Sequence, residues 1–321
     1  MSLRKLITTN TKRAASLVKH SSLPVYYLEG QYQDQPLRLL VADDGYTLPY
    51  MQSMVFPDGA TVSKKPAVSA FNAHHLAEAD ADMVVVGANY LLQGRYGANA
   101  FRIVPKWVRL FLPTRQEPYE RLYEQGRQTR KYFKWMLKKV KDAGFVCEVI
   151  NDREWLPRFY QDMYEPYAAH RYGEAAVFHD YVTVKKTLSH GGAIIVRKNE
   201  EEIAAVVFSL DDSEMRVPHF GAYIDKFDEV RDGANFALDF FTAELAHQKG
   251  CDHVDFGHSR PFLSDGVLRY KLNWHMDPVE DDDALSVFAI ATPGQSERGL
   301  RFLEENPFFE YIDGEIRMRD E

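Results

Sequence analysis

A lysine between two aromatic residues is the side chain that could most directly take part in catalysis. It is Lys271, in the segment YKLNW at residues 270–274. A fixed ammonium group can stabilise the negative charge that develops on a carbonyl oxygen during acyl transfer. Flanking aromatic rings would exclude water and so strengthen that charge. A surface lysine beside two core aromatic residues is the alternative, and the sequence leaves both open.

Two further side chains could move or orient a proton in such a reaction. Asp255 lies in the segment HVDFG, which is typical of a short strand. A carboxylate among apolar neighbours needs a partner, so Asp255 could orient an amine, hold Lys271, or form a structural hydrogen bond or salt bridge. Tyr270 could be the general acid that protonates the leaving group, although a packed tyrosine is the more common finding.

Cations that could hold phosphate or carboxylate groups gather in one basic segment. From Arg127 to Lys141 there are seven basic residues and no acidic residue. Arginine suits this task because its planar fork binds oxyanions through two hydrogen bonds. A solvated basic face is the alternative, and stacking of bases on interleaved aromatic residues is another. The candidate substrate-binding residues, here and elsewhere in the chain, are Arg127, Arg130, Lys134, Arg171, Arg260, Trp274, His219 and Gly221.

The composition indicates a folded, soluble chain. Of 321 residues, 45% are apolar and 27% charged, which excludes a disordered chain, a collagen-like repeat and a disulfide scaffold. No apolar run approaches the roughly 18 residues that span a bilayer, and the first residues lack the apolar core of a signal peptide. The two cysteines are expected to be free thiols in a reducing compartment, which predicts a cytoplasmic protein.

The net charge and the spacing of the histidines indicate which binding partners to expect. The net charge of −8 argues against a protein that binds nucleic acid non-specifically. His253 and His258, on either side of Asp255, match no strong metal-binding spacing, so no metal is expected.

The elements that must position these residues follow a mixed α/β order. A basic amphipathic helix is predicted at about residues 119–143, ended by Gly144, and a long apolar-faced helix at 233–249. Apolar runs predict strands at residues 25–30, 37–43, 83–88, 107–113, 144–150, 193–198, 203–210, 215–224, 253–257 and 286–292.

This order resembles the acyltransferases of the GNAT superfamily, and within it the FemAB-like branch, in which a basic helix joins two GNAT-like domains in tandem. Three segments carry the resemblance: RQTRKYFKWMLKKVKDAGF, then HRYG at residues 170–173, and GANFALDFFTAELAHQKGCDHVDFGHSRP followed by YKLNW. The resemblance covers residues 119–275. Residues 1–113 resemble the first of the two GNAT-like domains more weakly.

The resemblance implies an α/β fold of two tandem GNAT-like domains. The first is residues 1–144, including the basic helix, and the second is residues 145–321, with about the last 30 residues packing back on the first. The resemblance further implies that Lys271 stabilises the oxyanion. It also places Gly221 where two parallel strands splay to admit the acyl carbonyl.

GNAT enzymes that use acyl-CoA usually carry the motif R/Q-x-x-G-x-G/A, which wraps the pyrophosphate with backbone N–H groups at a helix N-terminus. The corresponding stretch here is VRDGAN at residues 230–235. Gly233 is in place, whereas the first and last motif positions are valine and Asn235, and Asp232 adds repulsion. Gly233 and Asn235 are the candidate cofactor-binding residues.

The expected function is therefore transfer of an acyl group from acetyl-CoA, another acyl-CoA or an acyl carrier to a small-molecule or peptide amine. One alternative is a peptidoglycan-type aminoacyltransferase that uses aminoacyl-tRNA, a partner disfavoured by the net charge. Another is a catalytically silent module of the same fold that binds an anionic sugar or peptide precursor.

Overall fold

The computed structural model describes residues 3–43, 47–118, 120, 126–173, 176, 179–211, 213–281 and 284–318. The chain divides into two compact units. Unit 1 consists of Met1–Arg109, His258–Tyr270 and Pro278–Glu321, and unit 2 consists of Leu110–Gly257 and Lys271–Asp277. Each unit therefore takes residues from both halves of the sequence.

Unit 1 contains a six-stranded sheet in the order β3-β1-β2-β4-β13-β5. Its strands are β1 (Ser22–Tyr32), β2 (Gln35–Ala42), β3 (Ala60–Ser69), β4 (Met83–Asn89), β5 (Arg102–Pro105) and β13 (Ser286–Ala291). The strands β2 and β4 are parallel, whereas β13 is antiparallel to both of its neighbours.

The core of unit 1 lies on both faces of this sheet. Every residue of β4 is buried, as its continuous apolar run predicts. Val85 packs in one hydrophobic cluster with Met51 and Phe302. Its neighbour Val84 packs in a second cluster with Tyr96. Successive side chains of a strand point to opposite faces, so one run of valines serves two layers of the core.

The helices and the remaining strands of unit 1 surround this sheet. They are α1 (Leu3–Lys19), α2 (Thr47–Val55), η1 (Ala73–Glu78), η2 (Tyr90–Leu92), α3 (Gln93–Gly97), η7 (Pro293–Gln295), α12 (Glu297–Glu305) and the hairpin β14 (Phe309–Ile312) and β15 (Glu315–Met318).

Helix α1 was not expected from the sequence because it docks through polar side chains. Its buried residues include Thr9 and Arg13. The Arg13 guanidinium lies 3.8 Å from the centroid of the Tyr90 ring, and its Nε donates to the Ala284 carbonyl at 2.9 Å. An apolar stripe is the usual sign of a packed helix, whereas these contacts of α1 are made by polar and charged side chains.

The second sheet has seven strands in the order β12-β6-β11-β10-β9-β8-β7. Most of its residues belong to unit 2. The strands are β6 (Val108–Pro113), β7 (Phe145–Ile150), β8 (Gly191–Lys198), β9 (Glu201–Asp211), β10 (Glu214–Ala222), β11 (His253–Ser259) and β12 (Asp277–Val279). The strands β7 to β10 run antiparallel in turn, and β10 and β11 are parallel.

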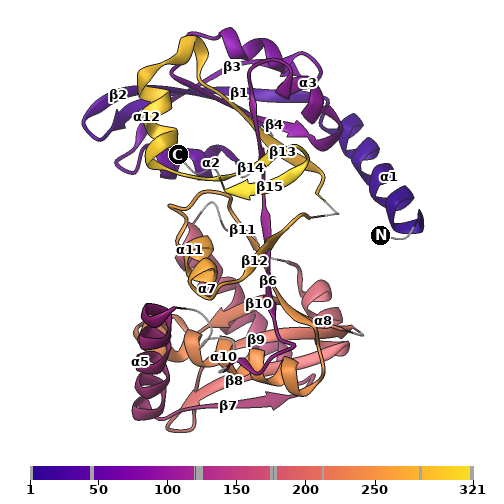
Figure 1. Cartoon of the computed structure of the whole chain (residues 1–321), viewed down its shortest axis with the longest axis vertical. Helices are drawn as coiled ribbons and strands as arrows, with labels where there is room; N and C mark the ends of the chain where they lie inside the picture. Colours follow the sequence, from indigo (N-terminus) through magenta and orange to yellow (C-terminus); the bar gives the residue numbers. More distant parts are fainter. Residues whose placement is uncertain are drawn as a thin grey trace. The chain divides into compact units, whose positions relative to one another are not determined.

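In each sheet, one strand that lies next to a parallel pair comes from the other half of the chain. In unit 1, β13 follows the pair β2 and β4 (Figure 1). In the second sheet, β6 follows the pair β10 and β11. This exchange of strands explains why the units differ from the predicted division at residue 144. The basic helix belongs to unit 2, and residues 278–321 belong to unit 1.

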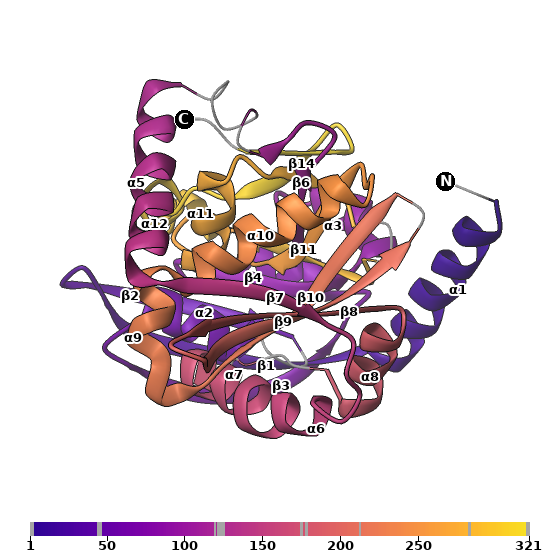
Figure 2. The same cartoon turned by 90° about the horizontal axis from the view of Figure 1, so that it is seen from below.

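Helices cover both faces of the antiparallel strands of unit 2. Figure 2 shows α10 on one side of β7, β8 and β9, with α6 and α8 on the other. The helices are α5 (Arg127–Ala143), α6 (Leu156–Arg158), η3 (Phe159–Tyr164), α7 (Glu165–Tyr172), α8 (Tyr181–Ser189), η5 (Ile224–Lys226), α9 (Phe227–Glu229), η6 (Val230–Ala234), α10 (Asn235–Gln248) and α11 (Gly266–Asn273), which crosses the boundary between the units.

The basic helix α5 ends as predicted. Gly144 has φ 73°, and its N–H donates to the carbonyls of Lys141 and Val140, the arrangement that a left-handed glycine makes available. Residues 119 and 121–125 of the predicted helix lie outside the described residues. Among the helices that the structure describes, none combines the length and apolar character needed to cross a bilayer.

Candidate functional site

The parallel strands β10 and β11 stay paired only near their beginnings. Residues 214–216 pair with residues 253–255. The register of β10 against β9 shifts between Arg216 and His219, around Pro218, which has no N–H to donate. The backbone groups of β11 beyond this point need other partners, since buried peptide groups are almost always hydrogen-bonded.

Lys271 supplies partners to β11 at this position. Its Nζ donates to the Phe256 carbonyl at 2.7 Å and to the Gly257 carbonyl at 3.1 Å. The side chain comes from α11 and is 7% exposed, which excludes the surface-lysine alternative. A hydrogen bond from a charged donor contributes about 1.5–3 kcal/mol, so this ammonium also stabilises the local backbone.

Asp255 acts on the same short segment of β11. It is 6% exposed, and its Oδ1 accepts a hydrogen bond from the Gly257 N–H at 2.8 Å. Gly257 has φ 71°, in the left-handed region that glycine adopts without steric cost. The carboxylate therefore fixes a turn in the strand at the residue whose carbonyl Lys271 binds.

Tyr270 and Trp274, the aromatic residues on either side of Lys271, have different environments. Tyr270 is partly buried. Trp274 is 2% exposed, and its ring packs 4.9 Å from that of Phe133 and 5.0 Å from that of Phe236, measured between centroids. Trp274 therefore packs in the aromatic core, and its expected contact with substrate stays a prediction.

His219 is also a core residue. It is 1% exposed, and its Nε2 lies 3.1 Å from the Thr187 hydroxyl. Burial lowers the pKa of His219 to about 3, with a further contribution from nearby His179. The ring is therefore neutral at neutral pH and does not supply the charge expected of a substrate-binding cation.

Gly221 serves packing. A Cβ at this position would lie 2.9 Å from Cε2 of Phe159 and 3.0 Å from Cα of Tyr164. Both neighbours belong to η3, a π-helical turn. The absence of a side chain at Gly221 therefore allows that turn to approach β10 closely, and the expected role of Gly221 beside the acyl carbonyl stays a prediction.

The predicted cations of α5 lie together, and Arg171 lies on another helix. Arg127, Arg130 and Lys134 are exposed, while Phe133 and Met136 form the buried side of α5. Arg171, on α7, donates to the Tyr167 hydroxyl at 2.6 Å.

Two aromatic residues of α5 face solvent, although their helical spacing is more often that of core residues. Trp135 is 56% exposed and Tyr132 is 41% exposed. The Nζ of Lys139 lies 5.6 Å from the centroid of the Trp135 ring. This surface combines cations with accessible rings.

The stretch expected to bind pyrophosphate does not fit that group. Gly233 has φ 137°. A Cβ at Gly233 would lie 3.4 Å from Cγ2 of Val140, so the side of the glycine that lacks a side chain faces α5. Asp232 pairs with Lys139 at 3.1 Å and brings a negative charge to the turn. The Asn235 amide lies 3.4 Å from Oδ2 of Asp239.

The histidines near Asp255 each pair with a carboxylate. His253 Nε2 lies 2.9 Å from Glu214 Oε2, and His258 Nε2 lies 3.1 Å from Asp281 Oδ2. Over the described residues, no group of three or more histidine, cysteine, aspartate or glutamate side chains is arranged to hold a metal ion.

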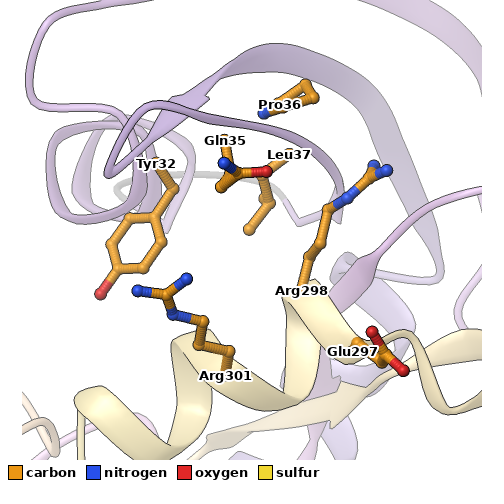
Figure 3. Close-up of a pocket in the computed structure, with 7 residues that line it drawn as sticks. All are labelled: Tyr32, Gln35, Pro36, Leu37, Glu297, Arg298 and Arg301. Carbon is orange, nitrogen blue, oxygen red and sulfur yellow. The ribbon is translucent and has the colours of Figure 1, made fainter.

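Unit 1 has a pocket that sequence reasoning missed (Figure 3). Its lining residues are Tyr32, Gln35, Pro36, Leu37, Glu297, Arg298 and Arg301. Both arginines already have acidic partners, since Arg301 pairs with Glu305 at 2.9 Å and Arg298 with Asp82 at 3.6 Å. Segments far apart in the sequence form this pocket, so no local motif marks it.

The comparisons with known proteins agree with the predicted resemblance over one part of the chain. Residues 127–272 match the family model described as an acetyltransferase (GNAT) domain. No curated protein matches the chain.

Three solved structures are examples of those similar to this chain. FemX is 12% identical, with 82% of this chain and 83% of that chain covered and a TM-score of 0.43. L-PGS from Bacillus licheniformis is 10% identical, with 95% and 96% covered and a TM-score of 0.42. A tandem GNAT protein from the clavulanic acid biosynthesis pathway is 11% identical, with 88% and 87% covered and a TM-score of 0.35. On the family match, residues 127–272 of this mixed α/β chain are similar to an acetyltransferase domain of the GNAT fold.

Proposed function

We propose that the chain is an N-acyltransferase, and that Lys271 stabilises the oxyanion of the reaction. The GNAT family match supports acyl transfer. The observation that carries the assignment of Lys271 is its buried ammonium, bound to carbonyls of β11 just beyond the last pair with β10. A preorganised donor at the oxyanion typically raises the rate of the reaction by about 10²–10³-fold.

The proposed reaction joins an amine to an activated acyl group. The amine nitrogen attacks the acyl carbonyl carbon, and the carbonyl oxygen takes up the negative charge. The carbonyl then re-forms and the bond to the leaving group breaks. The leaving group takes a proton from the Tyr270 hydroxyl, and the amine nitrogen gives its extra proton to the Tyr270 phenolate, which restores the hydroxyl. An anionic oxygen is a stronger acceptor than a peptide carbonyl, so it competes well for the N–H groups of Lys271.

The neighbouring residues have separate roles in this proposal. Asp255 is a positioning residue, because its carboxylate holds the Gly257 N–H and thereby the carbonyls that orient Lys271. Tyr270, next to Lys271 on α11, donates the proton that the leaving group takes up. A tyrosine hydroxyl is one of the groups that serve as general acids in enzymes.

The first proposed donor is acetyl-CoA or another acyl-CoA or acyl carrier, the class that fits a GNAT acetyltransferase domain. We assign no residue to its pyrophosphate, because residues 230–235 do not fit it. The acceptor is a small-molecule or peptide amine. Exposed Arg127, Arg130, Lys134 and Arg171 would hold its anionic groups.

A second donor, an aminoacyl-tRNA, is favoured by the surface of α5. Exposed Trp135 and Tyr132 stand among the cations of this helix. Rings that stack on bases and cations that neutralise phosphates are the two ingredients of single-stranded nucleic-acid binding. The net charge of −8 opposes this donor over longer distances.

A donor panel tests the proposal. The chain is incubated with amines and either acetyl-CoA or charged tRNA, and release of the CoA thiol or transfer of a labelled aminoacyl group is measured. We expect turnover with one donor class. Saturable binding without turnover in both arms would instead support the catalytically silent binding module.

A further inference from the structure

A buried arginine of unit 1 lies against two aromatic rings. Arg260 follows β11 and is 5% exposed. Its guanidinium carbon lies 3.8 Å from the centroid of the Trp107 ring and 4.5 Å from that of the Tyr50 ring. Cation–π contacts of this kind are favourable, but they cover the faces of the guanidinium and leave only its edges for hydrogen bonds.

Two donors in this cluster are unsatisfied. In the part of the chain that the structure describes, Nη1 of Arg260 is buried and has no hydrogen-bond partner, and the same is true of the Tyr50 hydroxyl. Burial raises the pKa of Tyr50, so its hydroxyl remains a donor at neutral pH. Buried donors without acceptors are rare and costly.

The carboxylates that act on Arg260 are already engaged elsewhere. Asp265 accepts hydrogen bonds at 2.9 Å from two backbone N–H groups in the first turn of α11. Asp43 pairs with Lys106 at 2.7 Å and also accepts a hydrogen bond from Thr47. Burial lowers the pKa of Arg260 to about 10, against the opposing effect of both carboxylates.

We propose that Arg260 anchors an oxyanion-binding site in unit 1 that takes a carboxylate or phosphoryl group. The edge of a guanidinium matches two oxygens of either group. The Tyr50 hydroxyl, on a ring that the guanidinium covers, supplies a neutral donor. Binding neutralises a buried charge and occupies Nη1, whereas a buried water would occupy Nη1 and leave the charge. This site stands independently of acyl transfer.

Thermal unfolding tests the site with inorganic phosphate and acetate as probes. The full chain is unfolded in chloride, phosphate or acetate at matched ionic strength. We expect phosphate or acetate to raise Tm by about 3 °C over chloride at about ten times Kd, and the better anion identifies the group. Arg260→Met should abolish this rise, and Arg260→Lys should reduce it because the planar fork is lost.

Two further variants separate binding from folding. Arg317→Met removes an exposed arginine of unit 1 that pairs with Glu315, and it should keep the full anion response. Tyr50→Phe removes only a hydroxyl and should fold normally with a smaller response. In chloride, Arg260→Met should be at least as stable as the wild type, since an uncompensated buried charge is removed.

The opposite results would overturn the site. If the wild type gains nothing from phosphate or acetate over chloride, a buried water satisfies Nη1 and there is no oxyanion site. If Arg260→Met and Tyr50→Phe both keep the wild-type response, the anions bind elsewhere.

Discussion

Lys271 and Asp255 bind the two backbone polar groups of one residue, Gly257. The Lys271 ammonium binds the Gly257 carbonyl at 3.1 Å, and the Asp255 carboxylate accepts the Gly257 N–H at 2.8 Å. Both side chains are buried. Among the described residues, the pairing of β11 with β10 ends at residue 255, so these side chains bind the backbone of β11 just beyond that point. The lysine proposed for catalysis and the aspartate proposed to position it thus also bind the backbone of β11.

This relationship makes Asp255 testable as a positioning residue. Asp255→Ala leaves the Gly257 N–H without its acceptor, and we expect a loss of about 1–3 kcal/mol in the free energy of unfolding. The turnover number should fall while KM stays nearly constant, because the oxyanion donor is displaced. Urea unfolding and steady-state kinetics measure the two effects.

Asp255→Asn is the matched control, since its amide oxygen can still accept the Gly257 N–H. It should recover most of the stability and turnover. If it were as inactive as Asp255→Ala while fully stable, the charge of Asp255 would act in the chemistry and the positioning role would be contradicted.

His219 predicts how stability depends on pH. The pKa of His219 is about 3 in the folded chain, below the ordinary histidine value of 6.5, so the unfolded chain binds an extra proton between these two pH values. Stability is therefore lost as the pH falls below about 6.5. Between pH 7 and pH 5 we expect this histidine to cost roughly 2 kcal/mol, since each pKa unit corresponds to 1.36 kcal/mol.

The measurement is urea unfolding of wild type and His219→Gln at both pH values. His219→Gln should lose less stability on acidification, and substitution of the exposed His190 by glutamine should leave the wild-type loss unchanged. An equal loss in wild type and His219→Gln would show that other groups cause it.

Substitution of Gly221 by alanine should lower the stability of the protein by steric overlap. Gly221→Ala brings a methyl group within 2.9–3.0 Å of η3, and overpacking of this kind costs about 1–3 kcal/mol. Gly94→Ala is the control, because nothing lies within 4 Å of its Cβ position and alanine favours a helix. Chemical denaturation should show a loss for the first and no loss for the second. Equal stabilities would mean that η3 moves aside easily.

Local sequence pattern was sufficient for most strands and for α5. The apolar run of β4 predicted a strand buried on both faces, and Gly144 predicted the end of the basic helix. The similarity of residues 127–272 to a GNAT domain was also predicted, from motifs close together in the sequence.

Features that depend on distant contacts were not predictable in this way. The division into units depends on β6 and β13, which join sheets built largely from the other half of the chain. Trp274 has the spacing of a site residue and is buried by Phe133 and Phe236. The rings that stack on Arg260 come from positions more than 100 residues earlier in the chain.

The rate of acyl transfer by Lys271 variants tests the central claim most directly. Lys271→Met keeps the length of the side chain and removes the ammonium, and exposed Lys249→Met in unit 2 is the matched control. Circular dichroism verifies that each variant is folded, and Lys271→Arg provides a second variant that keeps the charge. We predict that folded Lys271→Met loses about 10²–10³-fold in turnover number, that Lys271→Arg retains part of the activity, and that Lys249→Met is unchanged. A folded Lys271→Met with the wild-type turnover number would contradict the account.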